Sequence, residues 1–100
     1  MKPMFKKVTI VGMGMMGGSL GMALLKNRIA KEVCGAGRNI AKLNQAKKLY
    51  AATTVTDNLE EAVKGADLIV ISVVADKIAY MYKKLLEAGL CEDTIVTDMG

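Results

Sequence analysis

The sequence has 100 residues with no histidine and no tryptophan, and 52% of its residues are hydrophobic against 24% charged. This length and composition fit one globular domain and exclude a disordered or fibrous chain. Without histidine the chain holds no histidine-based metal site and no imidazole general base, so a reaction that needs such a base must take it from elsewhere.

The formal net charge is +4, from 14 basic and 10 acidic residues. Binding to nucleic acid would need a basic stripe with interleaved aromatic side chains, but aromatic residues make up only 4% of the chain. We therefore expect no nucleic-acid partner, and the charge suits an anionic small ligand.

The first predicted strand covers Lys7–Val11, a mainly apolar segment that ends at Gly12. A helix is predicted over Met15–Asn27, where apolar residues change to helical spacing. The run Val8–Leu25 carries no charge and imitates a signal peptide or a membrane span, but five of its eighteen residues are glycines that interrupt it. We expect a strand, a glycine turn and a helix, with no targeting segment and no membrane partner.

The rest of the chain continues the alternation of strands and helices. Further strands are predicted at Val33–Gly37, Thr53–Thr56, Leu68–Ala75 and Thr94–Thr97. Further helices are predicted at Ile40–Tyr50, Asn58–Lys64 and Asp76–Ala88. This order predicts an α/β fold: a doubly wound parallel sheet, Rossmann-like, with right-handed crossovers.

Local signals refine three places in this scheme. Asp57 is the predicted N-cap of the third helix, with Glu60 completing a capping box. The apolar segment Leu68–Ala75 is expected to be a buried central strand. Cys34 and Cys91 lie far apart without C-x-x-C spacing, so we expect both to be buried, reduced thiols in a cytoplasmic protein.

Gly12, Gly14 and Gly17 form a G-x-G-x-x-G pattern between the first predicted strand and the first helix. In this position the pattern indicates a dinucleotide-binding turn. Gly12 is expected to permit a tight turn, Gly14 to let the backbone approach a pyrophosphate, and Gly17 to let the helix pack on the sheet. Free N–H groups and the helix dipole would then hold the phosphates. The alternative is a glycine-rich turn in a Rossmann-like domain that binds no dinucleotide.

The methionines Met13, Met15 and Met16 occupy the other positions of this turn and are counted among the predicted cofactor-binding residues. Their side chains are expected to serve packing and the loop, and no metal site is predicted. Gly21, one turn after Gly17, is expected to continue the close contact between helix and sheet.

Arg38 and Asn39 follow the second predicted strand, where an NAD site normally has an acidic residue. No acidic residue occurs between Val33 and Thr56. The Arg38 guanidinium is suited to a 2′-phosphate or to stacking on adenine, and Asn39 to a hydrogen bond there. A solvated Arg38 is the alternative. We favour NADP(H) over NAD(H).

Ser72, Val73 and Val74 close the fourth predicted strand, where a nicotinamide would lie, and Lys77 follows in the next helix. Ser72 is suited to bond a ribose or carboxamide and Lys77 to reach the cofactor. The alternatives are a tolerated serine and a solvated lysine. Asp98, which ends the last strand, is either a ligand-edge group or the cap of a following helix.

The segment Val8–Leu24, VTIVGMGMMGGSLGMAL, resembles the opening of prephenate and arogenate dehydrogenases, in which a G-x-G-x-M-G-G-S-L-G-x-A-L run is typical. Three later segments, Gly35–Arg38, Gly65–Val73 and Ile95–Gly100, fall where that family has similar residues. The resemblance therefore covers essentially the whole chain. The first motif is fairly specific, whereas the later ones are shared with many β-hydroxyacid-type dehydrogenases.

The resemblance implies a tyrosine-pathway enzyme that oxidatively decarboxylates prephenate or arogenate and passes a hydride to NAD(P)+. In that family a histidine beyond the cofactor domain accepts the hydroxyl proton, and a helical second domain completes the active site and the dimer. We therefore expect residues 1–100 to be the dinucleotide-binding domain of a longer homodimeric enzyme, with no catalytic residue among them.

One departure from the family concerns the end of the fourth strand. The family usually has Ser or Thr followed by Pro, where this chain has Val73-Val74-Ala75, so a polar contact at Val73 is lost or supplied by Ser72. Two alternatives stay open: a non-catalytic nucleotide-sensing module, and another hydroxyacid-type or pyrroline-carboxylate enzyme. The GGSLG run at Gly17–Gly21 favours prephenate or arogenate dehydrogenase.

Overall fold

The computed structural model describes residues 3–99 and contains a five-stranded sheet with strand order β3-β2-β1-β4-β5, all pairs being parallel. The strands are β1 (Phe5–Val11), β2 (Ala30–Ala36), β3 (Thr54–Thr56), β4 (Leu68–Ile71) and β5 (Ile95–Asp98). The helices are α1 (Met15–Lys26), α2 (Ile40–Lys48), α3 (Leu59–Val63), the short 3₁₀ helix η1 (Ala75–Lys77) and α4 (Ile78–Glu87). The predicted doubly wound, Rossmann-like fold is confirmed.

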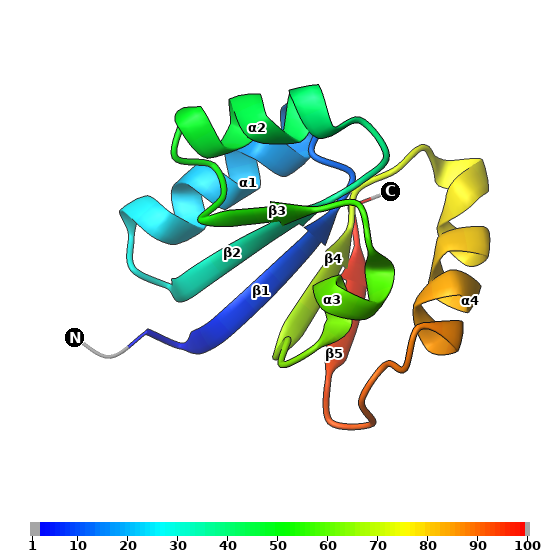
Figure 1. Cartoon of the computed structure of the whole chain (residues 1–100). Coiled ribbons are helices and arrows are strands. Elements are labelled where there is room, and N and C mark those ends of the chain that lie inside the picture. The colour runs from blue at the N-terminus through cyan, green and yellow to red at the C-terminus, as the bar shows by residue number, and fades with distance from the viewer. Residues whose placement is uncertain (1–2, 100) are drawn as a thin grey trace.

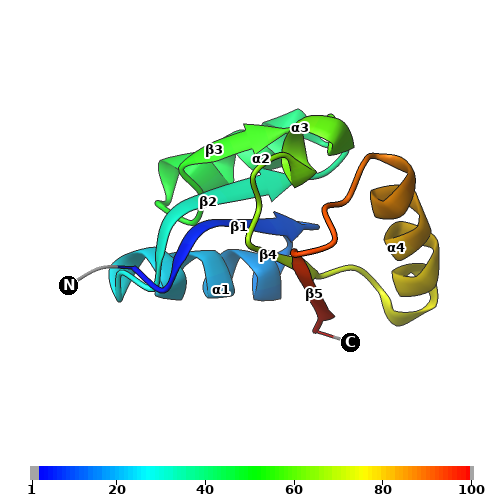
Figure 2. The ribbon, with the colours of Figure 1, turned by 90° about the horizontal axis from the view of Figure 1, so that it is seen from below.

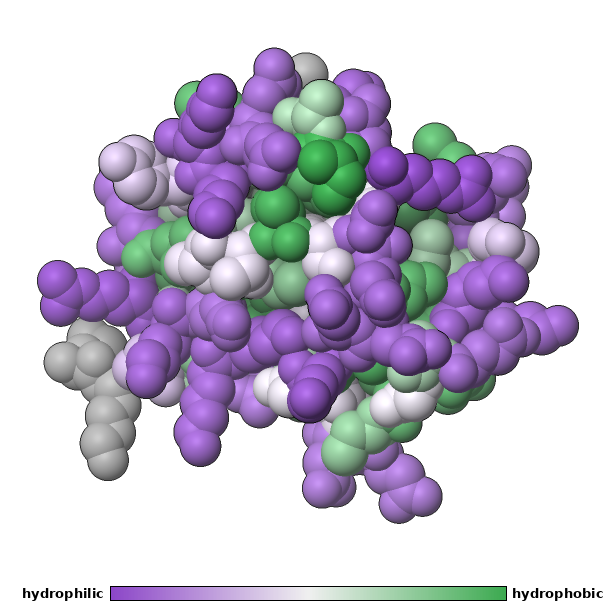
Figure 3. Space-filling model, in the orientation of Figure 1, coloured by the Kyte–Doolittle hydropathy of each residue, from purple (hydrophilic) through white to green (hydrophobic). Residues whose placement is uncertain are grey.

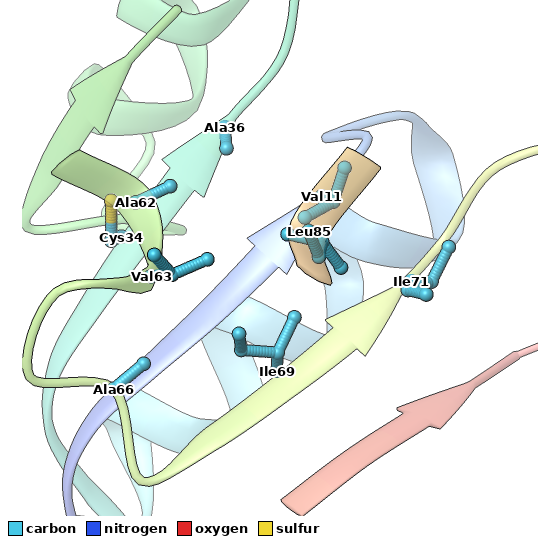
Figure 4. Close-up of a cluster of buried hydrophobic side chains, with 9 residues drawn as sticks. All are labelled: Val11, Cys34, Ala36, Ala62, Val63, Ala66, Ile69, Ile71 and Leu85. Carbon is cyan, nitrogen blue, oxygen red and sulfur yellow. The ribbon is translucent and has the colours of Figure 1, made fainter. Parts of the chain in front are cut away.

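Helices cover both faces of the sheet, with α1 on one face and α3 and α4 on the other (Figures 1 and 2). Successive residues of β1 therefore enter different clusters. Val8 and Ile10 pack with Leu24 of α1, whereas Val11 packs with Leu85 of α4. Figure 4 shows the second of these clusters, with side chains from β1, β2, β4, α3 and α4. Burial on both faces explains why the central strands are apolar almost throughout.

Buried and half-buried polar side chains hold the short helix α3 on the sheet. The hydroxyl of Thr9, which is fully buried, donates a hydrogen bond of 2.6 Å to the carbonyl of Ala62. The Nζ of Lys7 donates to the carbonyls of Glu61 and Lys64 at the end of α3. These bonds satisfy carbonyl groups that a five-residue helix cannot pair internally.

The fourth strand is confirmed as an interior strand, but it ends at Ile71, four residues before the predicted end. The N–H of Ser72 still donates to the carbonyl of Val11. At the next residue, Gly12, β1 turns away with φ +93°, so the chain after Ser72 no longer has β1 as a pairing partner. It continues instead into an exposed connection and η1, and α4 begins at Ile78.

Other predicted features also differ in detail. Asn58, not Asp57, caps α3, since its side chain accepts from the N–H groups of Glu60 and Glu61. Cys34 is buried as expected, whereas Cys91 is exposed in the α4–β5 connection. Both are free thiols.

The face of the molecule seen in Figure 1 is mainly hydrophilic. Figure 3, drawn from the same direction, shows hydrophilic residues over most of this face, with the hydrophobic areas separated from one another. Within residues 3–99 no helix has both the length and the apolar character that a membrane crossing requires.

Candidate functional site

The candidate site lies where the carboxyl ends of β1 and β4 meet in the middle of the sheet. Val11 pairs with Ile71, so the turn that starts at Gly12 adjoins the segment that starts at Ser72. From β1 the chain first builds the sheet toward β3 and then crosses back to β4 and β5. Doubly wound sheets bind ligands in the crevice outside such a switch point.

Gly12 and Gly17 allow the turn, the helix and Ser72 to approach one another. A Cβ at Gly12 would overlap the carbonyl oxygen of Ser72, and the φ of +93° is itself unfavourable for a side chain. A Cβ at Gly17 would overlap the Gly12 carbonyl oxygen and lie 3.2 Å from Cγ2 of Ile10. The packing of α1 on the sheet therefore depends on both glycines.

Gly14 differs from these two glycines because its surroundings are open. It is exposed, and among the described residues no atom beyond its two chain neighbours lies within 4 Å of the position that a Cβ would take. Gly14 is the N-cap of α1, no side chain caps this helix, and its first turn has no acidic residue. Backbone N–H groups at the start of α1 are thus available to an anion, with room for it to approach.

The other members of the turn take different environments. Met13 is half-buried and packs on the apolar cluster beneath α1, near Gly35. Met16 is 61% exposed, and the side chain of Met15 lies outside the described part of the structure. At Gly21 a Cβ would overlap the carbonyl oxygen of Ala51, so the close contact of α1 there is with the α2–β3 connection and not with the sheet as expected.

Arg38 and Asn39 follow β2 at the same edge of the sheet. The side chain of Asn39 accepts a hydrogen bond of 3.1 Å from the N–H of Lys42, so its oxygen caps α2. Arg38 is exposed and borders a cavity of about 190 Å³, here named the Arg38–Tyr80 cavity. The residues that line it are Val11, Gly37, Arg38, Asp57, Leu59, Tyr80, Met81 and Lys84.

Sequence reasoning did not assign Asp57, Tyr80 or Lys84 to the site. Asp57 follows β3, which pairs with β2, whereas Tyr80 and Lys84 lie on α4, after the chain has crossed from β3 to β4. No local motif marks them, because Asp57 approaches through the pairing of β3 with β2, and the two α4 residues through the packing of α4 against α3 and β4.

The segment after β4 brings two of its four predicted residues to the glycine turn. The Oγ of Ser72 lies 3.3 Å from the Cβ position of Gly17, and Cγ1 of Val73 lies 3.1 Å from that of Gly12. Val74 is 66% exposed, and Lys77, also exposed, precedes α4 and donates its N–H to the Val74 carbonyl. Neither Val74 nor Lys77 supplies one of the three atoms nearest to the Cβ position of Gly12 or of Gly17.

Asp98 ends β5, in register with Ile71 of β4. It therefore lies at the same carboxyl edge as the glycine turn. Within residues 3–99 no group of three or more His, Cys, Asp or Glu side chains is arranged to hold a metal ion.

Comparison with known proteins identifies several similar dehydrogenases. The chain is 26% identical over 100 residues to the prephenate dehydrogenase of Bacillus subtilis (strain 168), which covers all of this chain and 27% of that protein. It therefore spans about a quarter of that relative's length.

Solved structures agree with this match. A prephenate dehydrogenase from A. aeolicus, crystallised with hydroxyphenyl propionate and NAD+, has a TM-score of 0.84 and 28% identity, with 95% of this chain and 33% of that chain covered. The arogenate dehydrogenase of Synechocystis has a TM-score of 0.84 at 24% identity, covering 94% and 32%, and supports the fold.

These matches confirm the resemblance to prephenate and arogenate dehydrogenases that the sequence indicated. The family profile described as NADP oxidoreductase coenzyme F420-dependent matches residues 7–100. Since that match includes nearly the whole chain, the protein belongs to this NADP oxidoreductase family.

Proposed function

We propose that this chain is the dinucleotide-binding part of an NAD(P)-dependent enzyme that oxidatively decarboxylates prephenate or arogenate. The observation that carries the proposal is the glycine turn between β1 and α1. Gly12 and Gly17 pack it against Ser72, while Gly14 leaves the start of α1 open. A turn held rigidly from behind and open in front is suited to a pyrophosphate.

Residues of this chain suit three parts of NAD(P). Backbone N–H groups from Gly14 onward would hold the pyrophosphate, Arg38 would meet the adenosine end, and Ser72 with Val73 would border the nicotinamide. When bound, the nicotinamide supplies a hydride acceptor. The work of this chain is to hold and orient that ring at the switch point of the sheet.

We propose that NADP(H) binds more tightly than NAD(H). Arg38 is exposed at the end of β2, where an NAD site usually has a carboxylate. A guanidinium forms paired, charge-assisted hydrogen bonds with phosphate. Asn39 is committed to capping α2 through its oxygen, so Arg38 is the stronger of the two specificity candidates.

The remaining parts of the enzyme are proposed to lie outside residues 1–100. These parts are the substrate-binding residues, the proton acceptor and the dimer interface. The chain spans 27% of the B. subtilis prephenate dehydrogenase and contains no histidine. A general base would therefore act from outside this domain, in a cytoplasmic homodimer whose small-molecule substrate is prephenate or arogenate.

Fluorescence titration of the chain with NADPH and NADH tests the proposal. We expect saturable binding of both, with NADPH tighter, and competition by NADP+ but not by free nicotinamide. The midpoint temperature of thermal unfolding should rise with dinucleotide concentration, since the dinucleotide binds the folded state. Absence of saturable binding by either dinucleotide would overturn the cofactor assignment.

A further inference from the structure

The Arg38–Tyr80 cavity combines an apolar interior with a polar margin. Val11 is buried, and Leu59 and Met81 are half-buried. Arg38, Asp57, Tyr80 and Lys84 are exposed. Complete small-molecule sites measure roughly 300–1,000 Å³. A cavity of about 190 Å³ therefore suits one part of a larger ligand.

This cavity adjoins the glycine turn directly, because Val11 is both a lining residue and the last residue of β1 before Gly12. It extends from there to α4, on the side of the sheet that α3 and α4 cover. A ligand with its phosphates at the turn would thus place its adjoining nucleoside in this cavity.

Tyr80 and Lys84 lie one helical turn apart on α4. The Nζ of Lys84 lies 5.5 Å from the centroid of the Tyr80 ring and 3.9 Å from Oε2 of Glu87. The Lys84 and Glu87 side chains are 44% and 57% exposed. Ion pairs this exposed are weak, so Lys84 is available to a stronger anion.

We propose that Tyr80 and Lys84 form the outer wall of the adenosine subsite and that Lys84, together with Arg38, selects the 2′-phosphate of NADP(H). This inference rests on the proposed dinucleotide binding. The Tyr80 ring offers an aromatic face to a purine. Two cations on one small cavity suit a phosphate dianion, and the Asp57 carboxylate suits the exocyclic amino group of adenine.

The charge contribution is tested with Lys84→Gln and with Lys83→Gln as the matched control, since Lys83 is exposed on the same helix but does not line the cavity. We expect Lys84→Gln to weaken NADP+ binding about tenfold and to change NAD+ binding by less than about twofold, as for loss of one charge-assisted hydrogen bond. Lys83→Gln should bind both like the wild type.

The aromatic contribution is tested with Tyr80→Leu and with Tyr82→Leu as the control, because Tyr82 is similarly exposed and lies outside the cavity. We expect Tyr80→Leu to weaken NADP+ and NAD+ binding alike, by about fivefold or more, as for loss of base stacking. Circular dichroism and thermal unfolding should match the wild type in all four variants.

The outcomes separate this inference from the proposed function. If the wild type binds both dinucleotides, and the Lys84 and Tyr80 variants bind each of them with wild-type affinity, the α4 subsite is wrong and the glycine-turn site stands. An equal loss of NADP+ and NAD+ affinity in Lys84→Gln would remove its selectivity role. If the wild type binds neither dinucleotide, the proposed function fails, and this inference fails with it.

Discussion

Gly12 lies so close to Ser72 that no side chain fits between the turn after β1 and the carbonyl group after β4. This contact joins the two strand ends on either side of the switch point. Gly17 closes the same arrangement from α1, since its Cβ position overlaps the Gly12 carbonyl. The backbone that would hold a pyrophosphate is therefore positioned by packing behind it.

Gly12 and Gly14 should respond differently to alanine. Gly12→Ala is expected to lower the free energy of unfolding by about 2 kcal/mol or more, because the side chain meets both an unfavourable φ and the Ser72 carbonyl. Gly14→Ala meets no described atom beyond its chain neighbours, and the lower N-cap preference of alanine offsets its smaller unfolded-state entropy, so stability should change by less than about 1 kcal/mol.

Dinucleotide affinity separates the two roles further. Gly14→Ala should weaken NADPH binding about tenfold or more despite its unchanged stability, because its methyl group occupies the approach to the start of α1. Urea denaturation and fluorescence titration on the same samples measure both effects. Wild-type affinity in Gly14→Ala would contradict a phosphate site at this turn.

Arg38→Asp should reverse the preference between the two dinucleotides. The carboxylate repels a 2′-phosphate and accepts hydrogen bonds from a ribose, so NADPH affinity should fall about tenfold or more while NADH affinity stays or rises. Lys31→Asp makes the same change in net charge on an exposed residue near the start of β2 and should leave the ratio of affinities unchanged. An unaltered ratio in Arg38→Asp would remove Arg38 from specificity.

The buried thiol should make stability depend on alkaline pH. Burial raises the pKa of Cys34 above its ordinary value of 9.0, while neighbouring Thr54 acts in the opposite direction. A raised pKa in the folded state means that the folded chain holds this proton more tightly than the unfolded chain. Stability should therefore fall as the pH rises above 9.0.

Denaturant unfolding between neutral and alkaline pH checks this dependence. Cys34→Ala should show a smaller loss of stability above pH 9.0 than the wild type. Cys91→Ala, at the exposed thiol, should behave as the wild type does. Equal alkaline slopes in all three proteins would contradict a buried, protonated Cys34.

Thr9→Val should destabilise the domain although it keeps the shape of the side chain. It removes the hydroxyl that donates to the Ala62 carbonyl and leaves a buried acceptor without its partner. The expected loss is about 1–3 kcal/mol in the free energy of unfolding. Thr97→Val, on the exposed edge strand β5, is the control and should change stability by less than about 0.5 kcal/mol. Equal effects of the two substitutions would contradict the structural role of Thr9.

The sequence predicted the parts of the site that depend on local signals. The Gly12–Gly17 turn follows a β-branched strand and opens a helix, so its place at the end of β1 is readable from neighbours in the chain. The end of β4 was not readable in this way, because the chain after Ser72 loses its pairing with β1 only where β1 turns away at Gly12.

The cap of α3 and the α4 wall of the cavity illustrate two further limits. Asp57 and Asn58 are both suitable capping residues, and only the backbone path selects Asn58. Tyr80 and Lys84 reach Arg38 through a crossover between distant strands, which no spacing along the chain encodes. The local backbone path decides the first, and long-range packing decides the second.

Amide chemical-shift changes in the ¹⁵N-labelled chain, recorded as NADP+ is added, locate the dinucleotide on the domain. We expect saturable shifts at the backbone N–H groups of residues 12–18 and around Ser72 and Arg38, with little change at the amino ends of the strands. No shifts, or shifts confined to the opposite edge near Lys6 and Lys31, would contradict a dinucleotide site at the glycine turn.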